Sequence, residues 1–155
     1  VTANEPAPML QLQGQRRGTM TLVPEQLAYA AGIIDGEGCI SIGVSGLSSI
    51  RLCVGNTQRG LIDLLHQWFG GNICTKRKQR PGHKTYYVWE VSSGDAVTAL
   101  TQVLPYLTIK VPQATLALAF QGTIGPRFKA VPPEVKLTRE GMIARMHVLN
   151  KRGVA

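Results

Sequence analysis

The chain has 155 residues, 44% of them hydrophobic, which is enough for one compact domain and too little for two independent ones. Its 17 Lys and Arg against 9 Asp and Glu give a formal net charge of +8, which favours a polyanionic partner over a neutral small-molecule substrate, although plain solubility would also explain a basic surface. No run of 18 apolar residues is present, and the first residues lack the charged and apolar segments of a secretion signal, so we expect neither a membrane span nor export.

The first predicted elements are an arm, a helix and a hairpin. Residues 1–20 contain two prolines and show no periodicity, which predicts an arm that is flexible or ordered only on a partner. Pro24 suits the first turn of a helix, and good helix formers continue to Gly38, where the helix should end. From Cys39, apolar and small polar residues alternate, and "SGLSS" separates this stretch from "IRLCVGN". The pattern predicts a β-hairpin with one apolar face and one open face.

The order of helix and hairpin is then repeated. A helical stripe over residues 57–69 ends at two glycines, and Pro81-Gly82 supplies the turn of a second hairpin within "NICTKRKQRPGHKTYYVWEVS". Further helices are predicted from Ser92 or Ser93 to about Leu104, from Pro112, and over residues 138–150. We therefore expect an α+β domain whose core spans residues 21–130, with residues 131–155 adding a linker and a helix to the same domain.

The cysteines indicate the redox state rather than a site. Cys39, Cys53 and Cys74 are odd in number and have no C-x-x-C spacing, so they predict neither a disulfide framework nor a structural zinc site. We expect reduced thiols in an intracellular, reducing compartment, whether cytoplasm, nucleoid or organelle.

The first helix carries a ridge of small residues. Ala28, Gly32 and Gly36 recur every four positions and therefore lie on one face of the helix. Such a ridge lets two helices approach closely, and the chain offers no second matching ridge. The natural partner is the same helix of a second copy, so we expect a homodimer with these residues and Ile33 in its interface.

Two acidic residues end that helix. If two copies cross with these ends together, two Glu37 side chains meet, and carboxylates that close resist joint ionisation unless a divalent cation lies between them. The alternative interpretation is that Asp35 and Glu37 are solvated residues in a turn between helix and strand.

The segment "LAYAAGIIDGEGCISI" resembles the signature of LAGLIDADG homing endonucleases, with Ala30 to Gly38 filling its nine positions. Ala30 replaces the leading Leu of the signature and Glu37 replaces its second Asp. Further on, "LTQVLPYLTIKVPQATLAL" resembles the family segment that brings a lysine to the active site, at the position of Lys110. The resemblance covers about residues 22–124 and implies an αββαββα fold with a saddle-shaped, four-stranded DNA-binding sheet. A single copy of the signature implies a homodimer.

The resemblance also assigns roles to residues. Glu37 of each subunit would bind Mg²⁺ at the dimer axis, with the Gly36 carbonyl as a further ligand, and Mn²⁺ or Ca²⁺ could substitute in crystals. Asn56 would orient the nucleophilic water. Arg59 and Lys110 would steady the scissile phosphate or the ordered water around it.

DNA reading is expected from alternate residues on the open face of the sheet. The candidates on the first hairpin are Ser41, Gly43, Ser45, Ser49, Arg51 and Cys53. Those on the second are Lys76, Arg77, Lys78, Arg80, Lys84, Thr85 and Tyr87. The parity of the last strand is ambiguous, because Tyr86 and Val88 compete with Tyr87 and Trp89 for the core side.

The resemblance implies a metal-dependent, site-specific endonuclease that cleaves both strands of a long, near-palindromic double-stranded DNA target and is encoded by an intron whose mobility it promotes. Two other functions remain open on the same fold. One is a maturase-like RNA-binding protein that assists intron splicing, and the other is a DNA-binding regulator without catalysis.

Overall fold

The computed structural model describes residues 21–43, 49–76, 81–126 and 129–151. The predicted arm, residues 1–20, lies outside these ranges. The helices are α1 (Pro24–Glu37), α2 (Arg59–Phe69), α3 (Ser93–Val103), the short 3-10 turn η1 (Leu104–Tyr106), α4 (Val111–Gly122) and α5 (Pro133–Leu149), and the strands are β1 (Gly38–Gly43), β2 (Ser49–Asn56), β3 (Asn72–Lys76) and β4 (Tyr86–Ser92). No helix within the described ranges has the length and apolar character needed to cross a membrane.

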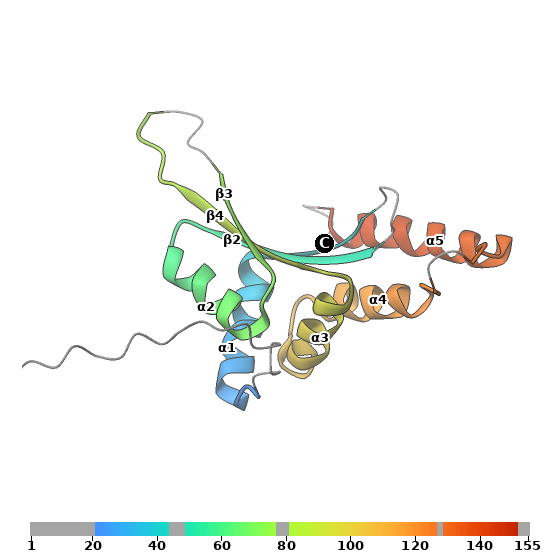
Figure 1. Ribbon diagram of the computed structural model, residues 1–155, viewed down its shortest axis with the longest axis horizontal. Coiled ribbons are helices and arrows are strands. Elements are labelled where there is room, and N and C mark those ends of the chain that lie inside the picture. The colour runs from blue at the N-terminus through green and yellow to red at the C-terminus, as the bar shows by residue number, and fades with distance from the viewer. Residues whose placement is uncertain (1–20, 44–48, 77–80, 127–128, 152–155) are drawn as a thin grey trace, which may run out of the picture.

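The strands form one antiparallel sheet in the order β1-β2-β4-β3. Helices α1 to α4 lie on one side of this sheet, and its other side curves upward towards the β3–β4 hairpin, so that the uncovered face is concave (Figure 1). The α+β class and the αββαββα order are therefore confirmed, with α4 and α5 added after α3.

The core lies between the sheet and the helices. The sheet contributes alternate apolar residues, including Ile40, Leu52, Val54 and Trp89, all of them fully buried. Alanines supply much of the helical side, on α1, α3 and α4, which lets the helices approach the sheet closely. Because side chains alternate along a strand, burial of this set leaves the intervening residues on the concave face.

The parity of β4 is decided by Trp89. Its indole N–H donates to the Gly70 carbonyl at 2.8 Å, and its ring lies 5.9 Å from that of Phe69. Tyr87 shares this face and packs against the core, whereas Tyr86 and Val88 face the concave side. The prediction that Tyr87 reads DNA from the open face is therefore wrong. Thr85 lies just before the strand.

Helix α5 closes one edge of the sheet. It begins at Pro133, five residues before the predicted start, because proline is favoured in the first turn of a helix. Its Met146 is buried in the core, and the Asn150 amide just beyond it donates to the Ile40 carbonyl of edge strand β1 at 2.8 Å. The helix therefore lies along β1 (Figure 1), where an uncovered strand edge would be open to pairing with another chain.

Candidate catalytic site and nucleic-acid interface

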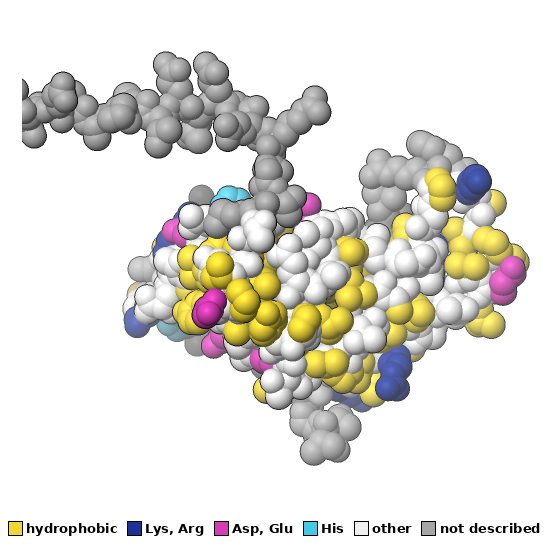
Figure 2. All heavy atoms as spheres, turned by 90° about the horizontal axis from the view of Figure 1, so that it is seen from below, with side chains coloured by type: hydrophobic (Ala, Val, Ile, Leu, Met, Phe, Trp, Pro, Cys, Tyr) yellow, Lys and Arg dark blue, Asp and Glu magenta, His cyan; other side chains and the backbone are white. Residues whose placement is uncertain are grey.

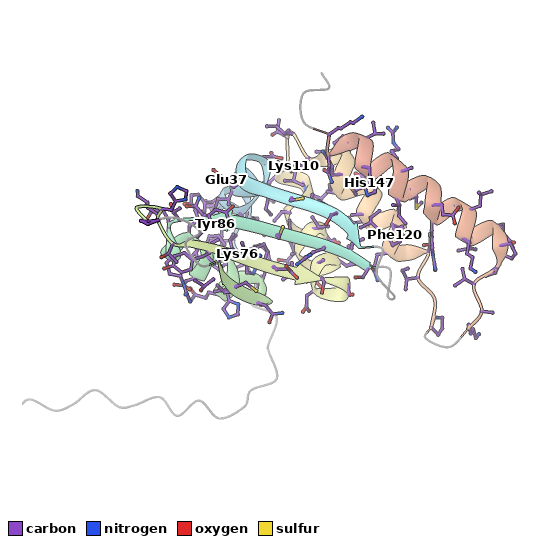
Figure 3. The ribbon with its side chains drawn as sticks, turned by 90° about the horizontal axis from the view of Figure 1, so that it is seen from above. Glu37, Lys76, Tyr86, Lys110, Phe120 and His147 are labelled. Carbon is purple, nitrogen blue, oxygen red and sulfur yellow. The ribbon has the colours of Figure 1, made fainter. Side chains whose placement is uncertain are left out.

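Glu37 ends α1 at the rim of the concave face. The side chain is exposed and makes no hydrogen bond or ion pair with any residue that the structure describes. Gly38 follows at once in extended conformation, and a Cβ there would lie 2.6 Å from the Ile34 carbonyl oxygen. The helix therefore passes into β1 without room for a side chain, and this tight junction sets where the Glu37 carboxylate lies (Figure 3).

Asp35 has a different environment. Its carboxylate accepts backbone N–H groups from Thr108 at 2.7 Å, Ile109 at 3.2 Å and Lys110 at 2.9 Å. Burial acts to raise the pKa of Asp35, but these hydrogen bonds together with the nearby Lys110 charge lower it below its usual value. The interpretation of Asp35 as a solvated turn residue is wrong, since its oxygens are occupied by the chain that leads into α4.

Lys110 lies at the same helix end. Its ammonium donates to the backbone carbonyl of Asp35, and the residue is half-buried at the start of α4. Figure 3 shows Glu37 and Lys110 at neighbouring positions along the β1 side of the molecule. The structure thus brings these two predicted residues to one place, together with Gly36, which is exposed on the last turn of α1.

Asn56 ends β2 at the same end of the strand pair. Because Gly38 pairs with Val54, the residues beyond Val54 lie beside the end of α1. The Asn56 side-chain oxygen accepts the N–H of Gln58 at 2.8 Å, an arrangement that turns the chain into α2. The amide nitrogen makes no hydrogen bond to the described part of the chain.

Arg59 is held by other partners. Its Nε donates to Asp63 at 2.7 Å, and its guanidinium lies 5.2 Å from the ring centre of Tyr87. No contact joins Arg59 to Glu37, Asn56 or Lys110 among the described residues. The predicted catalytic residues therefore fall into two places. Glu37, Asn56 and Lys110 lie near the end of α1, whereas the Arg59 side chain is bound to Asp63 of its own helix and to the Tyr87 ring.

The concave face carries the predicted DNA readers of the first hairpin. Its register aligns Cys39 with Cys53, Ser41 with Arg51, and Gly43 with Ser49. Arg51 forms an ion pair with Glu90 of β4, a partner that the sequence pattern does not indicate. Ser45 lies outside the described residues.

The second hairpin contributes positive charge. Lys76 ends β3 on the concave face opposite Tyr86, and Figure 3 shows both from that side. Lys84 is exposed before β4. The predicted contacts Arg77, Lys78 and Arg80 lie outside the described residues.

Tyr86 is a concave-face residue that the sequence prediction leaves out. A Cβ at Gly55 would overlap the Tyr86 hydroxyl, so the ring lies directly over this glycine. Gly55 adjoins Asn56, which brings the Tyr86 hydroxyl towards the end of the sheet that holds Glu37. The strong apolar alternation of Trp89 and Val91 is the sequence signal that could have assigned Tyr86 to this face.

All three cysteines of the chain also face the concave side. A hydrogen bond between the Cys39 and Cys53 thiols lowers the pKa of Cys39 and raises that of Cys53. Cys39 and Cys74 are exposed, and no disulfide joins the cysteines. No group of three or more His, Cys, Asp and Glu side chains within the described ranges could hold a metal ion.

No residue that the structure describes covers the predicted dimer ridge. A Cβ added at Gly32 or Gly36 would meet no atom within 4 Å, and Ala28 is exposed beside them, while Ile33 is half-buried. Two large apolar side chains are also exposed. Tyr29, within α1, is 53% accessible, and Ile109, just before α4, is 67% accessible. Figure 2 shows that hydrophobic side chains gather at several places on this helical side.

Solved structures share this architecture. The homing endonuclease I-CvuI in complex with its target in the presence of calcium superposes with a TM-score of 0.67 at 24% identity, over 84% of this chain and 86% of that one. The archaeal intron-encoded homing endonuclease I-Vdi141I complexed with DNA also gives 0.67, at 13% identity, over 84% and 87%. The LAGLIDADG homing endonuclease I-SmaMI bound to cleaved DNA gives 0.54 at 18% identity, over 84% of this chain and 45% of that one.

These similarities define a sheet-and-helix fold used by DNA-bound homing endonucleases. The chain has the LAGLIDADG homing endonuclease fold, as the resemblance of residues 22–124 predicted. No family profile matches the sequence, and no curated protein matches it.

Proposed function

We propose that the chain is one subunit of a homodimeric, site-specific DNA endonuclease that uses a divalent metal ion, Mg²⁺ in the cell. The observation that carries this proposal is the exposed Glu37 carboxylate, which has no partner among the described residues and lies beside the Lys110 segment at the rim of a concave sheet. An intron origin accords with the solved structure described as intron-encoded.

The concave face is the proposed DNA surface. Among the described elements no helix covers this side of the sheet, and it presents Lys76 and Arg51 on a chain of net charge +8. A two-stranded ribbon fits the major groove of B-DNA, where alternate side chains can contact base edges. Basic residues at the margin would contact phosphates and fix the register of the protein on the duplex.

A second copy is proposed to pack on the glycine ridge of α1. The open space over Gly32 and Gly36 allows another helix to approach without displacing side chains. The matched region amounts to 45% of the I-SmaMI chain, which leaves room for a second unit of this size in that protein. A two-fold arrangement would present one Glu37 from each subunit to a near-palindromic site.

The chemistry of Glu37 fits a hard cation. Mg²⁺ prefers oxygen ligands and usually takes only one or two carboxylates, with water or phosphate oxygens completing its shell. Since the described residues of one chain hold no ligand cluster, Glu37 and the Gly36 carbonyl would share the ion with the second subunit and the DNA. When bound, such an ion polarises a phosphoryl oxygen and lowers the pKa of a bound water.

The remaining residues act around the scissile phosphate. The Lys110 ammonium supplies positive charge at the end of α1, where it can offset charge that develops on the phosphate. The Asn56 amide nitrogen can donate a hydrogen bond to a phosphate oxygen, while its carbonyl oxygen can accept one from the attacking water. Arg59 lies against Tyr87 and would have to leave that ring to reach the phosphate.

The proposal is tested with Glu37→Gln, which removes the charge and keeps the shape. The cleaved site is first obtained by incubating the protein with a library of DNA sites and Mg²⁺ and sequencing the cut ends. We expect the variant to lose cleavage while its DNA affinity stays within roughly threefold, because a charge at the reacting phosphate contributes mainly to the transition state. Glu25→Gln, at the other end of the same helix, is the matched control and should cleave normally.

Undiminished cleavage by Glu37→Gln would refute the assigned metal ligand. Specific DNA binding by the unaltered protein, with no cleavage of any site, would instead indicate a regulator. Preferential binding of structured intron RNA would indicate a maturase-like protein.

A further inference from the structure

Asp35 links two segments that are far apart in the sequence. Its carboxylate accepts N–H groups from residues 108–110, which follow Asp35 by 73 to 75 positions in the sequence. In return, the Lys110 ammonium donates to the Asp35 backbone carbonyl. The end of α1 and the start of α4 are thus joined by hydrogen bonds in both directions, from a single acidic residue.

These bonds constrain the position of Lys110. Its backbone is held by the carboxylate at 2.9 Å and its side chain is held by the adjacent carbonyl, so both ends of the residue are attached to Asp35. Glu37 lies two residues further along the same helix end. Asp35 therefore sets the distance between the proposed metal ligand and the lysine. Glu37 is connected to it by the last turn of α1, and Lys110 is connected to it by hydrogen bonds.

The charge of Asp35 matters for this attachment. A carboxylate can accept all three N–H groups at once, and charge-assisted hydrogen bonds are stronger than neutral ones. An asparagine of the same shape offers one oxygen, and its NH₂ group would face N–H donors. One or more of the backbone N–H groups at residues 108–110 would then lose its partner and the segment would move.

We infer that Asp35 is a positioning residue for the proposed endonuclease, acting by holding Lys110 in register with Glu37. The inference rests on the proposed function but adds a residue that contacts neither DNA nor metal in that proposal. A shift of about 1 Å at a catalytic group can lower a rate by roughly 100-fold, so attachment of this kind has a measurable effect on the chemical step.

The test is a double-mutant cycle of Asp35→Asn and Lys110→Ala. Single-turnover cleavage is measured with enzyme in excess over its DNA site, alongside DNA affinity and denaturant unfolding of each variant. We expect Asp35→Asn to slow cleavage by roughly 10- to 100-fold with affinity within about threefold. In the Lys110→Ala background it should cost no more than about twofold further, because the residue it positions is gone. Asp95→Asn, an exposed acid in the first turn of α3, is the control.

Multiplicative losses in the double variant would overturn the inference, as would a loss of stability with normal cleavage by the folded fraction. Asp35→Glu provides a second variant that keeps the charge but moves the carboxylate by one methylene, and the same dependence on Lys110 is expected of it. If neither variant folds, the role of Asp35 is structural and the inference fails. Absence of cleavage by the unaltered protein overturns the proposed function itself, whereas normal cleavage with independent effects overturns the positioning role alone.

Discussion

Two glycines beside the proposed site exclude side chains for different reasons. Gly38 has backbone angles of −80° and 156°, which any residue adopts, so its conformation does not require glycine. What excludes a side chain there is the backbone of Ile34, since a Cβ at Gly38 would lie 2.6 Å from its carbonyl oxygen and 2.9 Å from its Cα. At Gly55 the obstacle is the tip of Tyr86, a side chain that is 43% exposed.

The two contacts predict different costs for the same substitution. In Gly38→Ala the helix backbone must move, and we expect a loss of about 2–3 kcal/mol in the free energy of unfolding, at the upper end of overpacking costs. In Gly55→Ala the Tyr86 ring can swing towards solvent, so the loss should stay below about 1 kcal/mol. Urea unfolding of both variants measures the difference. A larger loss for Gly55→Ala would show that Tyr86 is held more firmly than its exposure indicates.

At the scale of elements, α1 has one face that packs in the core and one that is proposed to bind a second subunit. One buries Ala30, Ala31 and Ile34 against the sheet, while the other presents the ridge of Gly32 and Gly36 to open space. Glycine inside a helix costs about 1 kcal/mol relative to alanine, so two glycines on an exposed helix surface weaken an isolated subunit. In the proposed dimer, a partner helix packed against these glycines would offset that loss of stability.

The ridge can be tested without disturbing the subunit. In Gly32→Leu the new Cβ would lie more than 4 Å from any neighbouring element in the described part of the chain, so folding should be unimpaired, whereas a second helix could no longer approach. We expect its dimer dissociation constant to rise by at least about tenfold, corresponding to roughly 1.4 kcal/mol. Sedimentation over a range of concentrations measures this. Gly141→Leu in α5, equally open, is the matched control, and similar behaviour of the two variants would contradict the assigned interface.

At the scale of the whole molecule, the two sides of the sheet are chemically distinct. Helices cover one side, whereas the other is concave and carries all three cysteines of the chain. Two of these thiols, Cys39 and Cys74, are exposed. They are therefore reporters of whatever covers the concave face.

We expect specific DNA to protect Cys39 and Cys74 from alkylation by a maleimide, because the duplex would lie over both strands that carry them. Mass spectrometry of the labelled peptides, with and without DNA, measures protection at each residue. High salt should restore labelling, since log affinity falls with log salt at roughly −0.9 per neutralised phosphate of B-DNA. Unchanged labelling in a saturated complex would mean that DNA binds another face.

Local patterns in the chain were sufficient to predict much of the fold. Alternation from Cys39 marked the first hairpin, two glycines marked the end of α2, and Pro24 marked the start of α1, all of them as observed. These signals are reliable because the period of a helix or strand, and the way glycine and proline interrupt it, depend on residues close in sequence. Glu37 and Lys110 were likewise identified from short motifs, and their roles in catalysis remain predictions.

Features that depend on distant partners could not be read in the same way. The side of the sheet that Tyr87 faces followed from the contact of Trp89 with Gly70, and Arg51 found its partner Glu90 across a strand pairing. Spacing alone could not distinguish the role of Asp35 from that of Glu37, since both are acids at a helix end. The structure distinguishes them, because the Asp35 carboxylate accepts three N–H groups from residues 108–110. Hydrogen bonds and ion pairs select by position in space, and folding brings those positions together from separate parts of the chain.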